Sequence, residues 1–175
     1  RVILIGKRGT DIGFYPKFIK NQKQVNVEEV FKGLPKLHAG EGKMGVTPYM
    51  SNEVSEYLLE KQITNGLDYT TLHIARPQNE QDKEIYREAI IKWFEKGERL
   101  NYNDLEGHLK THKNRHSFVD RFKVVAPNLP ASQTVVAHIA KDGHYYIHPD
   151  IEQNRSLSVR EAARLQSLDR KSTRL

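Results

Sequence analysis

The stretch RSLSVREAARLQS, residues 155–167, predicts a helix with a well-defined start. Ser158 can accept a hydrogen bond from the backbone N–H of Glu161 while the Glu161 carboxylate accepts one from the N–H of Ser158, which is a capping box. Leu157 precedes the cap, where an apolar side chain can pack onto the first turn. From Asp169 the sequence continues with polar residues that offer no apolar face to bury. We therefore expect a short helix that begins at Ser158.

The composition indicates a globular chain with a basic surface. Its 175 residues are enough for one domain or two small lobes, and no run of about 18 apolar residues could span a membrane. The net charge of +6 and the pI of 9.4 fit a polyanionic partner, although an excess of lysine is also common on surfaces that bind nothing. The sequence contains no cysteine, which excludes disulfides, thiolate metal sites and cysteine nucleophiles within this chain.

Apolar periodicity and turn residues divide the rest of the chain into short elements. An apolar stripe at helical spacing, ended by Gly97, predicts the longest helix and places the stripe in the core. Its members are Ile85, Tyr86, Ala89, Ile90, Trp93 and Phe94. Asp142-Gly143 between two β-rich runs predicts a hairpin over 134–148. The other expected elements are a short helix from Asn26 to Gly33 with Asn26 and Glu29 at the capping spacing, an irregular glycine-rich stretch over 38–50, a helix capped by Ser51 and ended by Asn65-Gly66, a strand over 69–77, a short helix within 103–112 and a strand over 122–130.

Two motifs have the spacing of a cofactor or metal site, and we assign neither. The stretch GEGKMG, residues 40–45, matches a dinucleotide-binding fingerprint, but Val46-Thr47-Pro48 follows it where a helix should begin, so we expect a flexible loop. His108, His112 and His116 would share one helix face, but no acidic or thiolate ligand completes the set nearby. We therefore predict no metal.

A basic segment surrounds these histidines. It carries five cations between Lys110 and Lys123, opposed by Asp120 alone. Such a stretch can neutralise nucleic-acid phosphates, and a solvated basic face is the alternative interpretation. The candidate DNA contacts are Lys110, His112, Lys113, Asn114 and Arg115.

The predicted hairpin is a second candidate surface, because a two-stranded ribbon can enter a major groove and place polar side chains beside base edges. The alternative is a hairpin that only closes a small domain. The candidate base contacts are Ser132, Gln133, Thr134, Lys141 and Asp142.

Residues 155–167 resemble the ninth conserved motif of DNA cytosine-5 methyltransferases, whose usual form is Arg-x-Leu-Thr/Ser-x-Arg-Glu-x-Ala-Arg-Leu-Gln followed by Ser-Phe-Pro. The opening RVILIGKR, residues 1–8, resembles the end of that family's eighth motif, in which Gln-x-Arg-x-Arg precedes an apolar strand. The region between, including 134–150, resembles a target recognition region of the family. The order and separation of the two motifs support each other.

The resemblance implies an enzyme that flips a cytosine out of duplex DNA, attacks it with a cysteine and transfers a methyl group from S-adenosylmethionine. The family's nucleophile and cofactor loops precede its eighth motif, so the resemblance implies a fragment that is inactive alone and holds no cofactor-binding residue. Only Arg1 maps to the family's active site, where it would contact the flipped base. Arg155 and Arg160 are further candidate DNA contacts. The expected partner is double-stranded DNA, bound by a monomeric enzyme of a restriction-modification system in a bacterial cytoplasm.

The resemblance also sets the expected fold class, which is α/β. Residues 1–20 would form the edge of a Rossmann-like methyltransferase catalytic domain, 21–154 a small mixed α+β target recognition domain, and 155–168 the ninth-motif helix. Leu168 stands where the family continues with Phe-Pro, and 169–175 resembles a translated sequencing adapter, so we expect a non-native tail there. A self-standing nucleic-acid-binding module without enzymatic activity is the alternative function.

Overall fold

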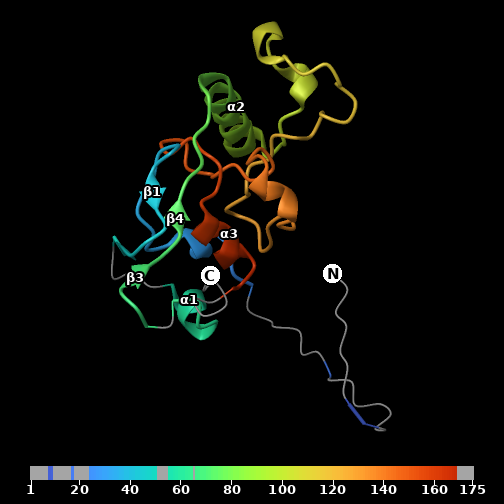
Figure 1. Cartoon of the computed structure of the whole chain (residues 1–175). Coiled ribbons are helices and arrows are strands. Elements are labelled where there is room, and N and C mark those ends of the chain that lie inside the picture. The colour runs from blue at the N-terminus through green and yellow to red at the C-terminus, as the bar shows by residue number, and fades with distance from the viewer. Residues whose placement is uncertain (1–7, 10–16, 18–23, 51–54, 65, 169–175) are drawn as a thin grey trace.

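The computed structural model describes residues 8–9, 17, 24–50, 55–64 and 66–168 (Figure 1). The predicted strand over 2–6, with Arg1, and the predicted Ser51 cap and tail over 169–175 lie outside the described residues. The helices are α1 (Glu56–Glu60), α2 (Glu80–Lys96) and α3 (Val159–Leu165), the 3-10 helices are η1 (Val27–Phe31), η2 (Tyr102–Asp104), η3 (Gly107–Leu109) and η4 (Ala137–Ala140), and the strands are β1 (Gly42–Lys43), β2 (Thr47–Pro48), β3 (Tyr69–Thr70) and β4 (His73–Ile74).

Helix α2 confirms the prediction from the apolar stripe. Its first turn is capped by the Asn79 side chain, which accepts a hydrogen bond from the N–H of Asp82 at 2.7 Å. Its last turn ends at Gly97, which has a left-handed φ of 68°. Ile85, Tyr86, Ala89 and Ile90 are buried in one of the two core clusters, with Trp93 packed against it. Phe94 was expected in the core but is 62% exposed, because the buried face of the helix ends one turn earlier.

The glycine-rich stretch over 38–50 was expected to be irregular, and this prediction was wrong at two places. β1 pairs antiparallel with β4, and β2 pairs antiparallel with β3. Gly42 makes the first pair possible, since a Cβ at this position would lie 2.2 Å from the carbonyl oxygen of His73. The glycines therefore allow close backbone approach within the chain.

The predicted strand over 69–77 is interrupted at Leu72, which has a left-handed φ of 59°. The Leu72 N–H donates to Met44 O at 2.8 Å, and the Leu72 carbonyl accepts from the N–H of Arg160 at 3.0 Å. The contact with α3 therefore divides one expected strand into β3 and β4, which pair with different partners.

Two other predicted helices differ from expectation in type or extent. Asn26 precedes η1, but its side chain makes no capping hydrogen bond. Glu29 instead accepts from Ser55 Oγ at 2.5 Å and pairs with Lys32 at 2.7 Å. In the segment 103–112 the expected α-helix is replaced by the short 3-10 helices η2 and η3.

The predicted hairpin over 134–148 is wrong. Residues 137–140 form η4, and Gly143 does not have the positive φ that a type I′ turn requires. A Cβ on Gly143 would lie 2.1 Å from Cβ of Ser156, so this glycine serves close packing rather than a turn. Ile147 pairs with Val124 in a parallel bridge and with Ser156 in an antiparallel bridge. The strand expected over 122–130 is reduced to the first of these bridges.

Residues 122–126 and 144–148 contribute side chains to both core clusters. One contains α2 and its neighbours, and the other contains Val27 and Val30 of η1 with Val125, Tyr146 and Leu157. Helix α3 packs on η1 and β4 in the middle of the molecule, with α2 toward one end and α1 toward the other (Figure 1). Within the described residues, no helix is both long and apolar enough to cross a membrane.

The variant Gly143→Ala should lower the free energy of unfolding by about 1–3 kcal/mol, because its new methyl group overlaps the Ser156 Cβ, which no rotamer change can move. The control is Gly107→Ala, where a Cβ has no neighbour within 4 Å. The control should leave the stability unchanged or raise it by up to about 1 kcal/mol. Urea titration of both variants measures this, and equal stability of the two would contradict the packing role.

Candidate functional site

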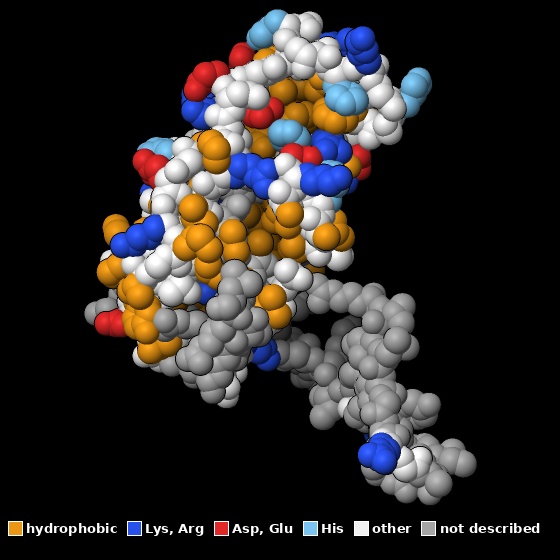
Figure 2. All heavy atoms as spheres, viewed as in Figure 1, with side chains coloured by type: hydrophobic (Ala, Val, Ile, Leu, Met, Phe, Trp, Pro, Cys, Tyr) orange, Lys and Arg blue, Asp and Glu red, His pale blue; other side chains and the backbone are white. Residues whose placement is uncertain are grey.

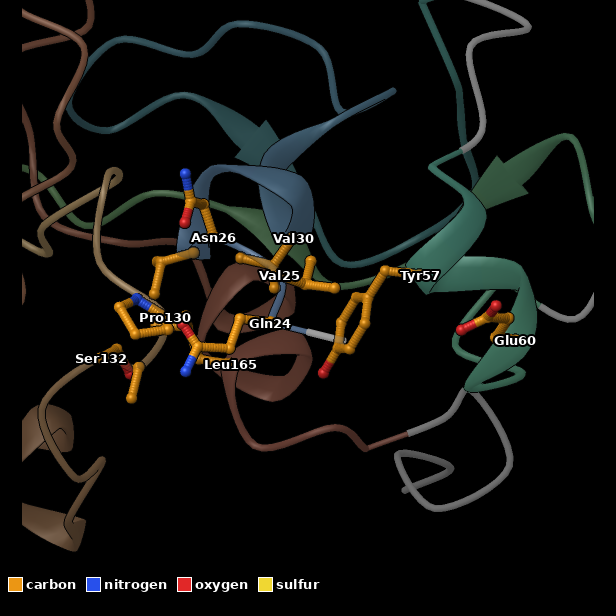
Figure 3. A pocket seen from close by; sticks show the side chains of 11 residues that line it. Gln24, Val25, Asn26, Val30, Tyr57, Glu60, Pro130, Ser132 and Leu165 are labelled. Atoms are coloured by element: carbon orange, nitrogen blue, oxygen red, sulfur yellow. The ribbon is translucent and has the colours of Figure 1, made fainter. Parts of the chain in front are cut away.

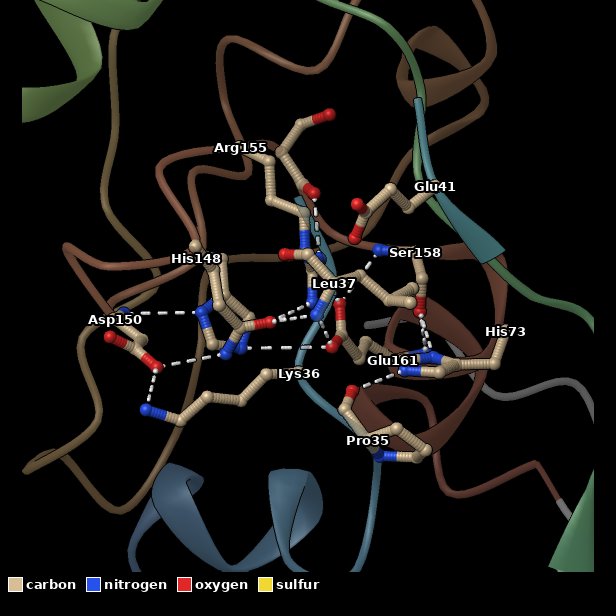
Figure 4. Close-up of polar contacts among 12 residues, drawn as sticks. Pro35, Lys36, Leu37, Glu41, His73, His148, Asp150, Arg155, Ser158 and Glu161 are labelled. Carbon is tan, nitrogen blue, oxygen red and sulfur yellow. Dashed lines mark hydrogen bonds and ion pairs between the residues drawn. The ribbon is translucent and has the colours of Figure 1, made fainter. Parts of the chain in front are cut away.

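A buried ion pair organises the segment 155–161. Arg155 is completely buried, and all five of its guanidinium N–H groups have acceptors (Figure 4). Nε donates to Leu37 O at 2.9 Å, and two hydrogen bonds of 2.8 Å reach the two carboxylate oxygens of Glu161. The remaining two donors bind Ser156 O at 2.9 Å and Gln153 Oε1 at 2.6 Å. A fully satisfied, bidentate pair of this kind fixes the relative position of every segment that it touches.

The predicted capping box is confirmed. The Ser158 side chain accepts from the N–H of Glu161 at 3.2 Å, and the Glu161 carboxylate accepts from the N–H of Ser158 at 2.7 Å. Burial alone would raise the pKa of Glu161, but the hydrogen bonds and charge of Arg155 outweigh it and lower that pKa to about 2. Glu161 therefore stays ionised and serves both the helix cap and the ion pair.

Two buried histidines complete this network. His73 Nε2 donates to Pro35 O at 2.8 Å, so its Nδ1 accepts from Ser158 Oγ at 3.0 Å. His148 Nδ1 accepts from the N–H of Asp150 at 3.1 Å, which leaves the His148 proton on Nε2, 3.6 Å from Glu161 (Figure 4). Burial lowers the pKa of both imidazoles, that of His148 to about 4. At neutral pH both rings are therefore uncharged.

The predicted DNA contacts of Arg155 and Arg160 are corrected by this geometry. The five donors of Arg155 are all used inside the protein. Arg160 is 3% exposed, and its guanidinium binds the carbonyl and hydroxyl oxygens of Thr71 at 2.8 and 3.0 Å. Both arginines are buried and bind groups of the protein itself, so they are not part of the exposed surface.

The basic segment, in contrast, is exposed. His112, Lys113, Asn114 and Arg115 are exposed, and Lys110 is half-buried with its ammonium donating to Asn103 O at 3.1 Å. The segment lies at the end of the molecule that carries α2 (Figure 1). The predicted phosphate-binding residues are therefore accessible from solvent.

A row of rings and cations connects this segment to the rest of the surface. The His112 ring stacks on Phe118 with centroids 3.9 Å apart. The Arg121 guanidinium lies 5.0 Å from the Phe118 centroid and 5.4 Å from that of Tyr145. Lys123 Nζ lies 4.9 Å from the Tyr145 centroid. In the space-filling view, Lys and Arg side chains gather across the middle of the molecule, with several His side chains above them (Figure 2).

This row ends in a groove of about 330 Å³, here called the Tyr145 groove. The groove contains two predicted base-contacting residues, Gln133 and Thr134, and Gln133 Nε2 donates to Tyr145 O at 2.6 Å. Ser132 lies apart from them, on a different pocket of about 340 Å³ that also borders Asn26 and Tyr57 (Figure 3). The Tyr145 groove is lined by Arg121, Lys123, Gln133, Thr134, Val136, His138, Tyr145 and Tyr146.

Lys141 and Asp142 follow η4 near this groove. Arg76 donates to the carbonyls of Ala140, at 2.6 Å, and of Lys141, and so fixes the end of η4. Asp142 pairs with Arg121, while the Lys141 side chain is exposed. The sequence analysis did not identify Arg76, because its partners are carbonyl groups about 65 residues away, which leave no local pattern.

The three spaced histidines do not form a metal site. They lie on a 3-10 helix and an irregular loop rather than on one helix, and His108 lies 3.4 Å from both Glu84 and Glu106. Among the described residues, no group of three or more His, Cys, Asp or Glu side chains has the arrangement needed to hold a metal ion. The three histidines are therefore not brought together on one helix face as their spacing suggested.

The chain is similar to type II methyltransferases along nearly its whole length. It is 42% identical over 177 aligned residues to a type II methyltransferase of Bacillus paralicheniformis, an alignment that covers 95% of this chain and 38% of the relative. It is also 34% identical over 85 residues to a candidate type II methyltransferase of Oceanobacillus iheyensis, covering 49% of this chain and 17% of that protein. No protein-family profile and no solved structure matches the chain. The chain thus spans well under half the length of these relatives.

Glu161→Gln should lower the free energy of unfolding by about 3–5 kcal/mol, because it leaves the buried Arg155 charge without its carboxylate. Glu152→Gln is the matched control, since Glu152 pairs with Lys36 on the surface, and it should cost less than about 1 kcal/mol. Chemical denaturation measures both. A Glu161→Gln protein as stable as the control would show that the pair is not essential.

Stability should fall as the pH drops from about 6.5 to about 4. The unfolded chain protonates His148 near its ordinary pKa of 6.5, whereas burial lowers its pKa in the folded protein to about 4. Between these values the unfolded state binds the extra proton, which costs about 1.4 kcal/mol per pH unit. Unfolding titrations at several pH values should show a shallower slope for His148→Gln but not for His116→Gln, a variant of an exposed histidine. Equal slopes in both variants would exclude His148 as the source.

Proposed function

We propose that this chain is the target-recognition part of a DNA methyltransferase that methylates carbon 5 of cytosine in duplex DNA within a bacterial restriction-modification system. The similarity to type II methyltransferases supports the methyltransferase class. The choice of cytosine carbon 5 is supported by the ninth-motif residues, from Arg155 to Ser167.

One observation supports this proposal most directly. Residues 155–157, which begin the ninth-motif resemblance, fix the backbone beside the Tyr145 groove. The N–H of Leu157 donates to Tyr146 O at 2.9 Å, and the N–H of His148 donates to Arg155 O at 2.8 Å. These two hydrogen bonds pair the backbone next to the Tyr145 groove with residues 155–157. Within that segment, Arg155 is held in place by its ion pair with Glu161. A motif that shapes the neighbouring DNA-binding surface fits a recognition role.

In this proposal the chain binds and positions DNA while the chemistry takes place elsewhere. The exposed cations of the basic segment neutralise phosphates, and Gln133, Thr134 and Lys141 lie where they can approach base edges. The cysteine that attacks the base must come from another part of the protein, because this chain has none.

S-adenosylmethionine would supply the methyl group when bound to the intact enzyme. The only glycine-rich stretch that resembles a nucleotide loop does not fit such a cofactor. The space beside Gly42 is filled by the backbone of His73 and Ile74, and no helix begins there. The described residues therefore provide no cradle for the cofactor at this stretch, and we assign the cofactor site to the remainder of the enzyme.

The second candidate, a self-standing nucleic-acid-binding module, would use the same basic surface. Expression of the full-length protein in a host without DNA methylation, followed by bisulfite sequencing of the host DNA, separates the two. We expect protected cytosines at one defined sequence. Methylation of adenine would overturn the cytosine proposal, and unmethylated DNA from a folded, expressed protein would favour the binding module.

In the full-length protein, the double variant Lys113→Ala with Arg115→Ala should weaken binding to all duplex sequences similarly. It should also lower the slope of log affinity against log salt concentration by about one unit per lost phosphate contact. Lys61→Ala is the matched control, because Lys61 is exposed at the end of α1, at the opposite end of the molecule (Figure 1). Salt titrations of fluorescently labelled DNA measure this, and an unchanged slope would make the basic segment a solvated face only.

A further inference from the structure

An apolar groove lies beside α3, here called the α3 groove. Its volume is about 580 Å³, and it is lined by Val159, Ala162, Ala163 and Gln166, which share one face of the helix, and by Ile139 of η4. Val159 is 53% exposed. In Figure 2, hydrophobic side chains lie together just below the band of Lys and Arg side chains, in the part of the molecule that holds α3 in Figure 1. An open apolar surface of this kind marks an interaction site.

The polar groups of the groove are largely occupied within the protein. Of the described residues that line it, only Arg76 is charged, and its guanidinium donates to carbonyls at the end of η4. Ser156 Oγ accepts from Gln78 Nε2 at 2.9 Å, and Ser158 Oγ binds His73 Nδ1 at 3.0 Å. DNA or a nucleotide would therefore meet few free donors there, and burying its polar groups would be costly. The groove favours the apolar side chains of a protein.

The remainder of the enzyme is the protein surface that fits the groove best. The alignment with the Bacillus relative covers 95% of this chain and 38% of the relative, so more than half of that protein lies outside the aligned part. A second copy of this chain fits less well. A symmetric contact would place the groove against itself, and two concave surfaces leave a void between them.

We propose that the α3 groove is the docking surface for the part of the same methyltransferase that lies outside this chain, which inserts apolar side chains between α3 and η4. The proposal goes beyond the proposed function. It rests on the similarity to longer type II methyltransferases, and not on the choice of cytosine or on DNA binding by the basic segment.

Docking at this place would also position the proposed recognition surface. Val135 and Ile139 line the α3 groove, whereas Val136 and His138, from the same short segment, line the Tyr145 groove. A protein surface that packs on one side of this segment therefore fixes the distance between the Tyr145 groove and the part of the enzyme that carries the chemistry.

The test introduces a photocrosslinking residue, p-benzoylphenylalanine, at position 159 of the full-length protein in the absence of DNA. The matched control carries it at position 136, because Val136 is 51% exposed but lines the Tyr145 groove instead. After irradiation, mass spectrometry identifies the crosslinked peptides. From position 159 we expect intramolecular crosslinks to residues outside this chain, at a yield several times that from position 136.

Three results would overturn the docking proposal: crosslinks from position 159 only to a second copy, crosslinks only within residues 1–175, or a yield no higher than that from position 136. None of them bears on which base is methylated. The bisulfite experiment tests that question separately, so this proposal and the proposed function can fail independently.

A second measurement uses Val159→Asp, which introduces no large group. Val159 is the first residue of α3, where a carboxylate favours the helix, and Val136→Asp is the control because Val136 is the N-cap of η4. If Val159 is covered, Val159→Asp should speed amide hydrogen exchange of α3 in the full-length protein roughly tenfold, since a buried valine is lost. The control should leave the exchange of α3 unchanged. Equal or slower exchange in Val159→Asp would show that the groove is free.

Discussion

The bidentate pair between Arg155 and Glu161 is the interaction on which the rest of this structure depends. Arg155 also binds the carbonyl of Leu37 and the side chain of Gln153, so one guanidinium joins the segment 153–161 to a residue 118 positions away in the sequence. Glu161 caps α3 with the same carboxylate. A buried pair is not in itself strongly stabilising relative to apolar residues, but removal of one partner leaves an uncompensated charge. The network therefore restricts the backbone to one arrangement.

This arrangement of the backbone fixes the position of the proposed DNA-binding surface. Because residues 155–157 are fixed, their backbone can pair with 146–148, and Tyr145 and the neighbouring groove are set at the surface. Arg76 fixes the end of η4 on another side by binding its last carbonyls. The proposed recognition surface is thus built from irregular segments whose positions are determined by arginines that bind backbone carbonyls.

The sequence predicted secondary structure correctly where the pattern involved residues close together in the chain. The α2 stripe, except for Phe94, and the capping box of α3 were predicted at the correct residues, since both depend on spacings of three or four positions. The exposed basic segment was also found from charge alone. The hairpin failed because Gly143 was taken as a turn residue, whereas it is required by the close approach of Ser156. Arg155 and Arg160 were expected to contact DNA, yet both are buried and each binds a backbone carbonyl remote in sequence, Leu37 O and Thr71 O.

By itself, therefore, the sequence determined the two capped helices, the absence of a cysteine nucleophile and the basic character of the chain, because these follow from composition and from neighbours along one helix. Only the tertiary structure decided which arginines are available to a ligand and which groups share the Tyr145 groove. Those properties depend on hydrogen-bond acceptors more than 60 residues away, such as Leu37 for Arg155 and Ala140 for Arg76. The physical reason is that burial and satisfaction of a charged group are set by the whole chain around it, not by the residues beside it.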